Sequence, residues 1–404
     1  MHCMKKYFLF GSIVIFALIL FGCSHVSSDE SKEEKEVAPN DGEAPPISTL
    51  VLEEPFKIGF MGPLTGNEAR YGESIKRGVE LAKKEARIKN LEVIYEDSKC
   101  DGKEAVNAIN KLISSDKVSV IIGEVCSGVT LAVAPIAEQQ KVVMISPAST
   151  SSKMSEFPYL FRTVPSDALQ GVFGAKFVYG RKYRKLAILY SNEEYGIGLE
   201  KVLKKKFTEL GGEVVSSEAV ERGATDIRPN IIKIKTATPQ VVYVILNSPA
   251  TAIAALRQIK ELEVNAVVIG SERLNNREVL EGAGDSAEGL IVTAVSSGTR
   301  EFGMRYEKEY GAKPGIFSAQ GYDAFIAVVR ALETGARSGD EIQKALVNIS
   351  FTGATGTIDF DEWGDISGNY STLIVKDASF VPFAGKEAET PEPTEIPGTP
   401  ASAQ

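Results

Sequence analysis

Histidine is almost absent from this chain of 404 residues, whose two histidines, His2 and His25, both lie near the N-terminus. The predicted folded region therefore contains none. This excludes Ser-His-Asp and Cys-His catalysis there, and also zinc held by histidine. The absence favours a binding protein over an enzyme, and we predict neither a catalytic residue nor a cofactor. A hydrolase that works through carboxylates alone stays open, because it needs only two acidic groups facing one substrate.

The motifs of nucleotide-binding proteins are missing as well. The chain has no G-x-x-x-x-G-K-[ST] segment, and its Gly-x-Gly segments at 196–198 and 282–284 lack the third glycine of a dinucleotide fingerprint. The net charge is −9 and no basic block occurs, which argues against a nucleic-acid partner. The acidic segment 359–365 has only part of a calcium-binding loop and predicts a strand and a turn instead. We predict no bound metal.

Cysteine is scarce, with four residues in the chain. Cys3 and Cys23 lie in the N-terminal segment, which leaves Cys100 and Cys126 in the folded region. In an exported protein such a pair most simply forms a disulfide. The disulfide would close a loop of about 26 residues and stabilise the fold by roughly 3 to 4 kcal/mol. Two cysteines without a histidine make a poor metal site.

Residues 1–22 predict a secretory signal peptide. A short charged start is followed by an apolar run over residues 7–21 and by a small residue before Cys23. The run is shorter than a membrane-spanning helix needs. The segment Leu20-Phe21-Gly22-Cys23 resembles a lipoprotein box, in which the peptide is cut before the cysteine and the new N-terminal Cys23 is acylated. We predict an extracytoplasmic chain anchored to the membrane by this lipid, with an uncleaved N-terminal anchor as the alternative.

Two terminal segments are too polar to fold. Residues 23–54 are rich in Ser, Glu, Lys and Pro and predict a disordered tether. Residues 385–404 are rich in Pro, Thr and Glu and predict a disordered tail. Roughly 330 residues lie between these segments, which is enough for two domains with substantial cores.

Short apolar segments alternate with longer amphipathic ones through the folded region. The predicted strands are 57–61, 91–96, 118–122, 142–145, 185–190, 213–217, 241–246, 266–269 and 290–293. The predicted helices include 72–89, 104–115, 196–210, 250–262 and 317–334. This alternation is typical of a parallel sheet with helices on both faces. It occurs twice, around breaks near residues 165 and 296, so we predict an α/β fold of two similar lobes.

Two loops in the first half form the strongest candidate site. The predicted strands 118–122 and 142–145 are followed by small polar loops, and the second loop, 146–150, is dense in hydroxyl groups. Because parallel strands end at the same edge of a sheet, the two loops should lie together. The helix that begins at Ser127 would direct its free N–H groups toward this edge, which suits an anion. Ordinary turn chemistry, with Ser127 only capping its helix, is the alternative.

Polar and aromatic residues also follow strands in the second half. Tyr195, Asn247 and Glu272 each follow a predicted strand. If the two lobes face each other across these edges, Glu272 lies opposite the predicted anion-binding loops of the first half and can pair with a cation. An anion-binding site that faces a carboxylate suits a zwitterion such as an α-amino acid, which carries one negative and one positive group. A solvated loop carboxylate is the alternative for Glu272.

Several segments together resemble the substrate-binding proteins of ABC importers for branched-chain amino acids, the type I periplasmic binding proteins. They are Ile58-Gly59-Phe60-Met61-Gly62-Pro63-Leu64-Thr65-Gly66, Tyr71-Gly72, Tyr95-Glu96-Asp97 with Cys100, Cys126-Ser127, Met144-Ile145-Ser146-Pro147-Ala148 with Thr150, Tyr195-Gly196 and Gly270-Ser271-Glu272. The resemblance implies two lobes joined by hinge strands. These lobes would be 55–165 with 296–352 and 166–295 with 353–383, and the hinges would lie near 164–166, 293–297 and 351–356.

The resemblance also implies roles for individual residues. The carboxylate of a bound amino acid would lie against Ser127, the Ala148 backbone and Thr150, with Ser149 beside them. Its ammonium group would pair with Glu272. The side chains that would line the space between the lobes are Tyr71, Tyr195, Asn247 and Phe317. Cys100 and Cys126 resemble the disulfide of the family.

Two departures from the family pattern concern specificity. Ser-Gly-Val at 127–129 stands where branched-chain binders tend to have a run of hydroxyl residues, and Asn247-Ser248 stands where an aromatic residue is frequent. A polar or a different aliphatic ligand therefore stays open. The resemblance implies a monomer that captures a small amino acid, closes over it without chemistry, and delivers it to an ABC permease. An amino-acid or amide sensor of the same fold, signalling to a separate membrane partner, is the alternative.

Overall fold

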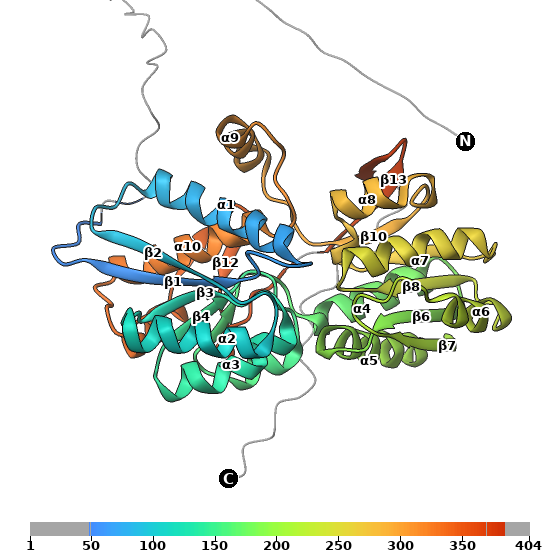
Figure 1. The fold of residues 1–404 in the computed structure, drawn as a ribbon, viewed down its shortest axis with the longest axis horizontal. Coiled ribbons are helices and arrows are strands. Elements are labelled where there is room, and N and C mark those ends of the chain that lie inside the picture. The colour runs from blue at the N-terminus through green and yellow to red at the C-terminus, as the bar shows by residue number, and fades with distance from the viewer. Residues whose placement is uncertain (1–47, 49, 369, 384–404) are drawn as a thin grey trace, which may run out of the picture. The chain divides into compact units, whose positions relative to one another are not determined.

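The computed structural model describes residues 48, 50–368 and 370–383. The predicted signal peptide, the acylation of Cys23 and the predicted tail 385–404 lie outside these residues. The described residues belong to one compact unit of the chain, which consists of two lobes (Figure 1). Within this part of the chain, no helix combines the length and the apolar character that crossing a membrane requires.

The first lobe is built on a five-stranded parallel sheet with the strand order β2-β1-β3-β4-β5. Its strands are β1 (Phe56–Gly62), β2 (Leu91–Asp97), β3 (Val120–Gly123), β4 (Val143–Ser146) and β5 (Leu160–Arg162). Every residue of β3 and β4 is buried, because helices cover both faces of the sheet. The ends of β3 and β4 therefore lie side by side, as the sequence predicts.

Two pairs of helices flank this sheet (Figure 1). Helix α1 packs against α10, and α2 packs against α3. The helices of this lobe are α1 (Ala69–Ala86), α2 (Gly102–Asn110), which continues as a π-helical turn (Lys111–Ser115), α3 (Ser127–Gln139), α9 (Arg300–Tyr310), α10 (Ser318–Glu333) and α11 (Gly339–Leu346). A 3-10 turn (Ser152–Glu156) precedes β5. The central helix α10 is buried along almost its whole length, which explains its apolar sequence.

The second lobe has a seven-stranded sheet with the order β14-β13-β10-β9-β8-β6-β7. Its strands are β6 (Lys185–Ser191), β7 (Glu213–Val220), β8 (Val241–Ile245), β9 (Val267–Gly270), β10 (Ile291–Ala294), β13 (Ser371–Lys376) and β14 (Ser379–Pro382). The strands β6 to β10 are parallel, whereas β13 and β14 add an antiparallel edge that the sequence did not predict. The prediction of parallel sheets flanked by helices is confirmed.

Each face of the second sheet has its own core. Ala187 and Leu189 of β6 point into one core, and Leu186 and Ile188 point into the other, as the twofold period of a strand requires. The helices that cover these faces are α4 (Asp167–Gly180), α5 (Glu194–Glu209), α6 (Arg228–Thr236), α7 (Pro249–Glu261) and α8 (Arg277–Ala283). Two 3-10 turns, Glu272–Leu274 and Gly284–Ser286, complete the lobe.

The chain passes between the lobes at different places from those predicted near the C-terminus. A short hairpin of β11 (Ser350–Thr352) and β12 (Thr357–Asp359) belongs to the first lobe, because Ile358, Phe360 and Ile366 are buried in its core. The assignment of 353–383 to the second lobe is thus wrong for residues up to 366. The predicted hinge at 351–356 is wrong for the same reason. The chain passes into the second lobe between Ile366 and β13.

The predicted tether extends too far at its C-terminal end. Leu52 is buried in the first core, and its carbonyl accepts a hydrogen bond from Asn90 Nδ2 at 2.9 Å. Ser48 Oγ donates to Glu333 Oε1 at 2.5 Å. Packing against the first lobe therefore begins before residue 54.

Candidate functional site

The loop between β3 and α3 places Ser127 at the start of a helix. The N-cap residue is Cys126, and no side chain caps this helix end. Ser127 Oγ instead accepts a hydrogen bond from the Thr150 backbone N–H at 3.2 Å, so it joins the two predicted loops. The alternative in which Ser127 caps its own helix is not what the structure shows. The N–H groups of Val129 and Thr130 donate to the Cys126 carbonyl, so those of Ser127 and Gly128, at the start of α3, are the ones that can receive an anion.

A disulfide fixes the base of this loop. Cys100 and Cys126 are bonded, with their Cα atoms 5.7 Å apart, as predicted. The buried carboxylate of Glu124 lies beside the disulfide and accepts from the Cys126 N–H at 2.6 Å and from Ser98. Burial raises the pKa of Glu124 to about 7. The two sulfur atoms and Glu124 lie close enough to suggest a metal site, but the disulfide already uses both thiols.

The loop after β4 contains one residue that faces the site and one that does not. Thr150 is fully buried, and its Oγ1 makes no hydrogen bond to any described residue. Ser149 has internal partners, since its Oγ lies 2.5 Å from Thr130 Oγ1 and 3.3 Å from the Glu124 carbonyl. Of the two predicted site residues, Thr150 has a hydroxyl that lies beside the Asp167 carboxyl and lowers its pKa, and Ser149 holds its own loop in shape.

Glu272 is a buried carboxylate rather than a solvated one. It begins the 3-10 turn after β9 and has no exposed surface. Its Oε2 accepts from Gln170 Nε2 at 2.6 Å and from the Tyr195 hydroxyl at 2.9 Å. Its Oε1 has no hydrogen-bond partner among the described residues. One oxygen is therefore held in place by the second lobe, and the other can receive a ligand.

Three aromatic side chains from both lobes come together near Glu272. Tyr71 of α1 and Phe317, which precedes α10, lie with ring centroids 6.2 Å apart. The Tyr71 hydroxyl donates across the lobes to the Asn247 carbonyl at 3.4 Å. Tyr195 of α5 completes the set, and all three rings are at most 1% exposed. Burial raises the pKa of Tyr71 to about 12, so this phenol stays neutral.

The sequence did not single out Arg273, which lies at the centre of these rings. Its guanidinium carbon is 4.8 Å from the ring centroid of Tyr195 and 5.4 Å from those of Tyr71 and Phe317. Its Nη2 donates to the Val125 carbonyl at 3.3 Å and the Ala148 carbonyl at 3.2 Å, both in the first lobe. The signal in the sequence was its place beside Glu272, but an arginine in a loop is usually exposed.

Arg273 still has unused donors. Its Nε lies 3.6 Å from Glu272 Oε1, which is too long for a hydrogen bond, and neither Nε nor Nη1 has a hydrogen-bond partner among the described residues. Burial lowers the pKa of Arg273, but its neighbours Glu272, Tyr195, Tyr71 and Glu193 together raise the pKa above its ordinary value, so the guanidinium stays charged.

Asp167 is a second buried acid that the sequence did not reveal. It begins α4, is 1% exposed, and neither of its carboxylate oxygens has a hydrogen-bond partner in the described part of the chain. Burial and the nearby charge of Glu272 raise its pKa to about 8. Asp167 is therefore mostly protonated at neutral pH.

These groups form what we call the interlobe site. Its buried polar atoms without a hydrogen-bond partner among the described residues are Thr150 Oγ1, Asp167 Oδ1 and Oδ2, Gln170 Oε1, Asn247 Oδ1, Glu272 Oε1 and Arg273 Nε and Nη1. Folded proteins rarely leave buried polar atoms unpaired, since each costs about 1 to 3 kcal/mol. A cluster of them indicates a place where a polar ligand binds.

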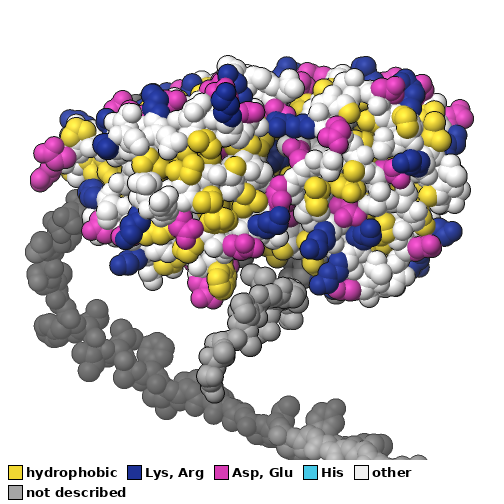
Figure 2. All heavy atoms as spheres, turned by 60° about the horizontal axis from the view of Figure 1, so that its bottom comes forward, with side chains coloured by type: hydrophobic (Ala, Val, Ile, Leu, Met, Phe, Trp, Pro, Cys, Tyr) yellow, Lys and Arg dark blue, Asp and Glu magenta, His cyan; other side chains and the backbone are white. Residues whose placement is uncertain are grey.

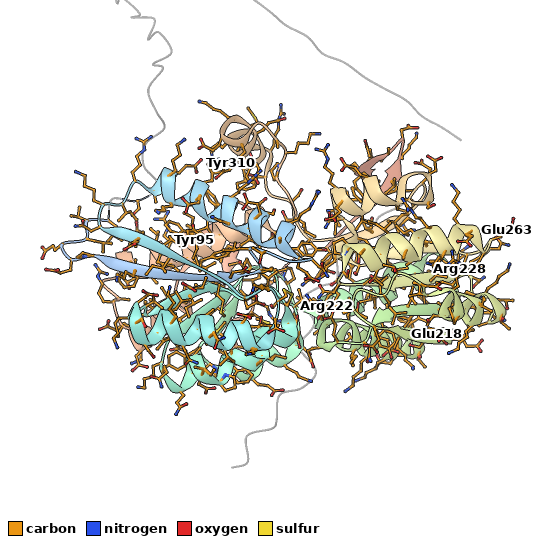
Figure 3. The ribbon with its side chains drawn as sticks, viewed as in Figure 1. Tyr95, Glu218, Arg222, Arg228, Glu263 and Tyr310 are labelled. Atoms are coloured by element: carbon orange, nitrogen blue, oxygen red, sulfur yellow. A yellow bond between two sulfur atoms is a disulfide. The ribbon has the colours of Figure 1, made fainter. Side chains whose placement is uncertain are left out.

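Contacts between the lobes surround the interlobe site. Arg222, which Figure 3 labels where the two lobes meet, pairs with Glu68 at 2.7 Å and donates to the Cys100 carbonyl at 3.0 Å. Lys153 pairs with Glu194 at 2.8 Å. On the face in Figure 2, acidic and basic side chains are interspersed over both lobes. The structure therefore has the two lobes in contact around buried polar groups.

A family model described as "Periplasmic binding protein" matches residues 55–378. A leucine-, isoleucine-, valine-, threonine- and alanine-binding protein of Pseudomonas aeruginosa is 31% identical over 327 residues, with 77% of this chain and 87% of that protein covered. A Leu/Ile/Val-binding protein of Escherichia coli is 28% identical, with 80% and 91% covered.

Solved structures agree with these relatives. A leucine-binding protein of Thermotoga maritima has a TM-score of 0.77 at 28% identity, covering 81% of this chain and 98% of that one. An ABC-transporter solute-binding protein of Rhodopseudomonas palustris, in complex with 3,4-dihydroxybenzoic acid, has a TM-score of 0.74 at 29% identity, with 81% and 95% covered. These relatives are solute-binding proteins, which confirms the prediction of a binder rather than an enzyme. The chain belongs to the periplasmic binding protein family.

Proposed function

We propose that this protein is an extracytoplasmic solute-binding lipoprotein that captures a small α-amino acid, branched-chain or related, between its lobes and delivers it to an ABC importer. The observation behind the proposal is that one lobe offers groups that bind an anion and the other lobe offers a group that binds a cation, on opposite sides of the interlobe site. The first lobe presents the N-terminus of α3 with Ser127 and Thr150, which suits a carboxylate. The second lobe presents the unpaired oxygen of Glu272, which suits an ammonium group.

The binding mode follows from the free atoms. The ligand carboxylate lies at the start of α3 and accepts from the Thr150 hydroxyl. The ammonium group donates to Glu272 Oε1. The ring-lined side of the site takes the side chain. Because the surroundings exclude water, each charge-assisted bond is stronger than it would be in solution.

Ligand binding and delivery are linked by lobe closure. Residues of both lobes contact the same ligand, so the ligand binds the closed arrangement more tightly than the open one. This difference in affinity determines how far binding shifts the equilibrium toward the closed arrangement. A permease that recognises the closed arrangement would then receive loaded binders. Acylation of Cys23 would keep a monomeric binder beside its permease and raise its effective concentration there.

The names of the relatives support the amino-acid class. The relative from P. aeruginosa is named for five α-amino acids, and the one from E. coli for three of them. All of these ligands share the α-carboxylate and α-ammonium groups that the free atoms of the interlobe site match.

The experiment is a thermal-shift screen of the purified chain with its disulfide intact. The probes are the common α-amino acids, their decarboxylated amines, and the acids that lack the amino group. A ligand at one hundred times its dissociation constant adds roughly 2.7 kcal/mol to stability, which a melting curve detects. We expect one or a few amino acids to raise the melting temperature while the matching amines do not. Stabilisation by non-zwitterionic acids or amides alone would overturn the proposal.

A further inference from the structure

The buried guanidinium of Arg273 has no role in holding the α-carboxylate and α-ammonium groups as assigned above. Building on the proposed function, we propose that Arg273 sets the ligand class, and that the preferred ligand is an acidic α-amino acid whose side-chain carboxylate pairs with Arg273. The observation behind this is a positive charge with two unpaired N–H edges on the ring-lined side of the interlobe site, where the ligand's side chain is placed.

The position of Arg273 comes first. Tyr71, Tyr195 and Phe317 were predicted to line the space between the lobes, and the guanidinium lies within 4.8–5.4 Å of all three ring centroids. The side chain of Arg273 has no exposed surface. An aliphatic ligand side chain would therefore meet a desolvated cation on this side of the site rather than an apolar wall.

The hydrogen-bonding state of Arg273 is the second step. Its Nη2 is used by the Val125 and Ala148 carbonyls, whereas Nε and Nη1 are free. These two nitrogens lie on different edges of the planar guanidinium, so a carboxylate can accept a charge-assisted hydrogen bond from one of them. A leucine-like side chain would leave both donors buried and unpaired, whereas a side-chain carboxylate would pair with one of them and bring a negative charge beside the guanidinium.

Charge balance gives the third step. Glu272 faces Arg273, with its Oε1 3.6 Å from Nε, and Glu193 also acts on the guanidinium. When the ligand's ammonium group pairs with the same oxygen, two cations share the charge of Glu272, which weakens the pairing of the buried guanidinium. A second carboxylate on the ligand supplies a further counter-ion. Asp167 does not, because its carboxyl group is itself mostly protonated at neutral pH.

The test is isothermal titration of the purified wild-type chain with glutamate, aspartate, their amides glutamine and asparagine, and leucine. Losing one charge-assisted contact corresponds to roughly 10- to 150-fold in affinity. We expect glutamate or aspartate to bind at least tenfold more tightly than its amide and than leucine. In Arg273→Met, this preference should disappear, because the acid loses affinity while leucine keeps or gains it.

Two further variants make the test decisive. Arg273→Lys keeps the positive charge but not the planar guanidinium and should retain the preference for the acid at reduced strength, which covers the case that Arg273→Met does not fold. Arg222→Met is the matched control, since Arg222 also joins the lobes but touches none of the three rings; it should weaken all ligands alike. Tightest binding of leucine by the wild type would overturn the inference and leave the proposed function standing. If no amino acid binds, the proposed function itself fails.

Discussion

Replacing Glu272 by glutamine tests the ammonium partner with little change in shape. Glutamine has the same length and can still accept the hydrogen bond that Tyr195 now donates to Oε2 at 2.9 Å. What it loses is the negative charge and, at Oε1, the acceptor that has no partner within the described residues. The variant therefore removes the group assigned to the ligand and keeps the packing around it.

The magnitude follows from the kind of contact. A hydrogen bond to a charged group contributes about 1.5 to 3 kcal/mol. The dissociation constant of the amino acid found in the screen should rise by roughly 10- to 150-fold in Glu272→Gln. Because the neighbouring Arg273 also loses its counter-ion, the unliganded variant should melt at a lower temperature than the wild type.

Isothermal titration measures the affinity, and a melting curve without ligand measures the stability. Glu194→Gln is the matched control, because Glu194 joins the lobes through Lys153 at 2.8 Å and Ser151 at 3.1 Å but lies outside the cluster of unpaired atoms. Its loss should change affinity by less than about fivefold, as for a partly exposed ion pair. Equal affinities of Glu272→Gln and Glu194→Gln would refute the placement of the ammonium group.

Three other predictions concern the fold around the site. Replacing both Cys100 and Cys126 by serine opens a loop with a sequence separation of 26 residues and should lower the free energy of unfolding in urea by about 3 to 4 kcal/mol; an unchanged midpoint would contradict this. The pKa of Asp167 rises from 3.8 to about 8 on folding, so the folded state holds a proton that the unfolded state has lost; its stabilising effect is complete below pH 4 and declines up to pH 8. Asp167→Asn should make stability flatter over that range in urea titrations, and an identical pH profile would count against it. Gly123 has φ +136° and an added Cβ would meet the Met61 carbonyl at 2.0 Å, so Gly123→Ala should destabilise the chain while Gly102→Ala, in open space, should not.

The sequence was sufficient for the parts of the site that follow strands directly. Ser127, Thr150, Tyr195 and Glu272 were found because residues after parallel strands share one sheet edge, and the structure places all four at buried positions. Arg273 and Asp167 could not be found in this way. Both are of residue types that are almost always exposed, and their burial becomes visible only when the folded structure is known.

The places where the chain passes between the lobes could not be predicted from local sequence patterns either. The hairpin β11–β12 was divided between lobes because its short strands do not indicate which core they join. Ile358 and Phe360 decide this by packing in the first lobe, where the Phe360 ring lies edge-on to Phe161 at 5.3 Å. Strands β13 and β14 were missed because their apolar and polar residues alternate only weakly. They also pair antiparallel and so do not follow the alternation of strands and helices that the prediction used.

The central claim is that one α-amino acid binds between the lobes with its two charged groups held from opposite sides. The most direct measurement is a crystal structure of the chain with the amino acid that stabilises it most. The account predicts the ammonium nitrogen about 3 Å from Glu272 Oε1 and the carboxylate at the start of α3, beside Ser127 and Thr150. A ligand bound elsewhere, or one whose carboxylate lies away from α3 and whose ammonium lies away from Glu272, would contradict it.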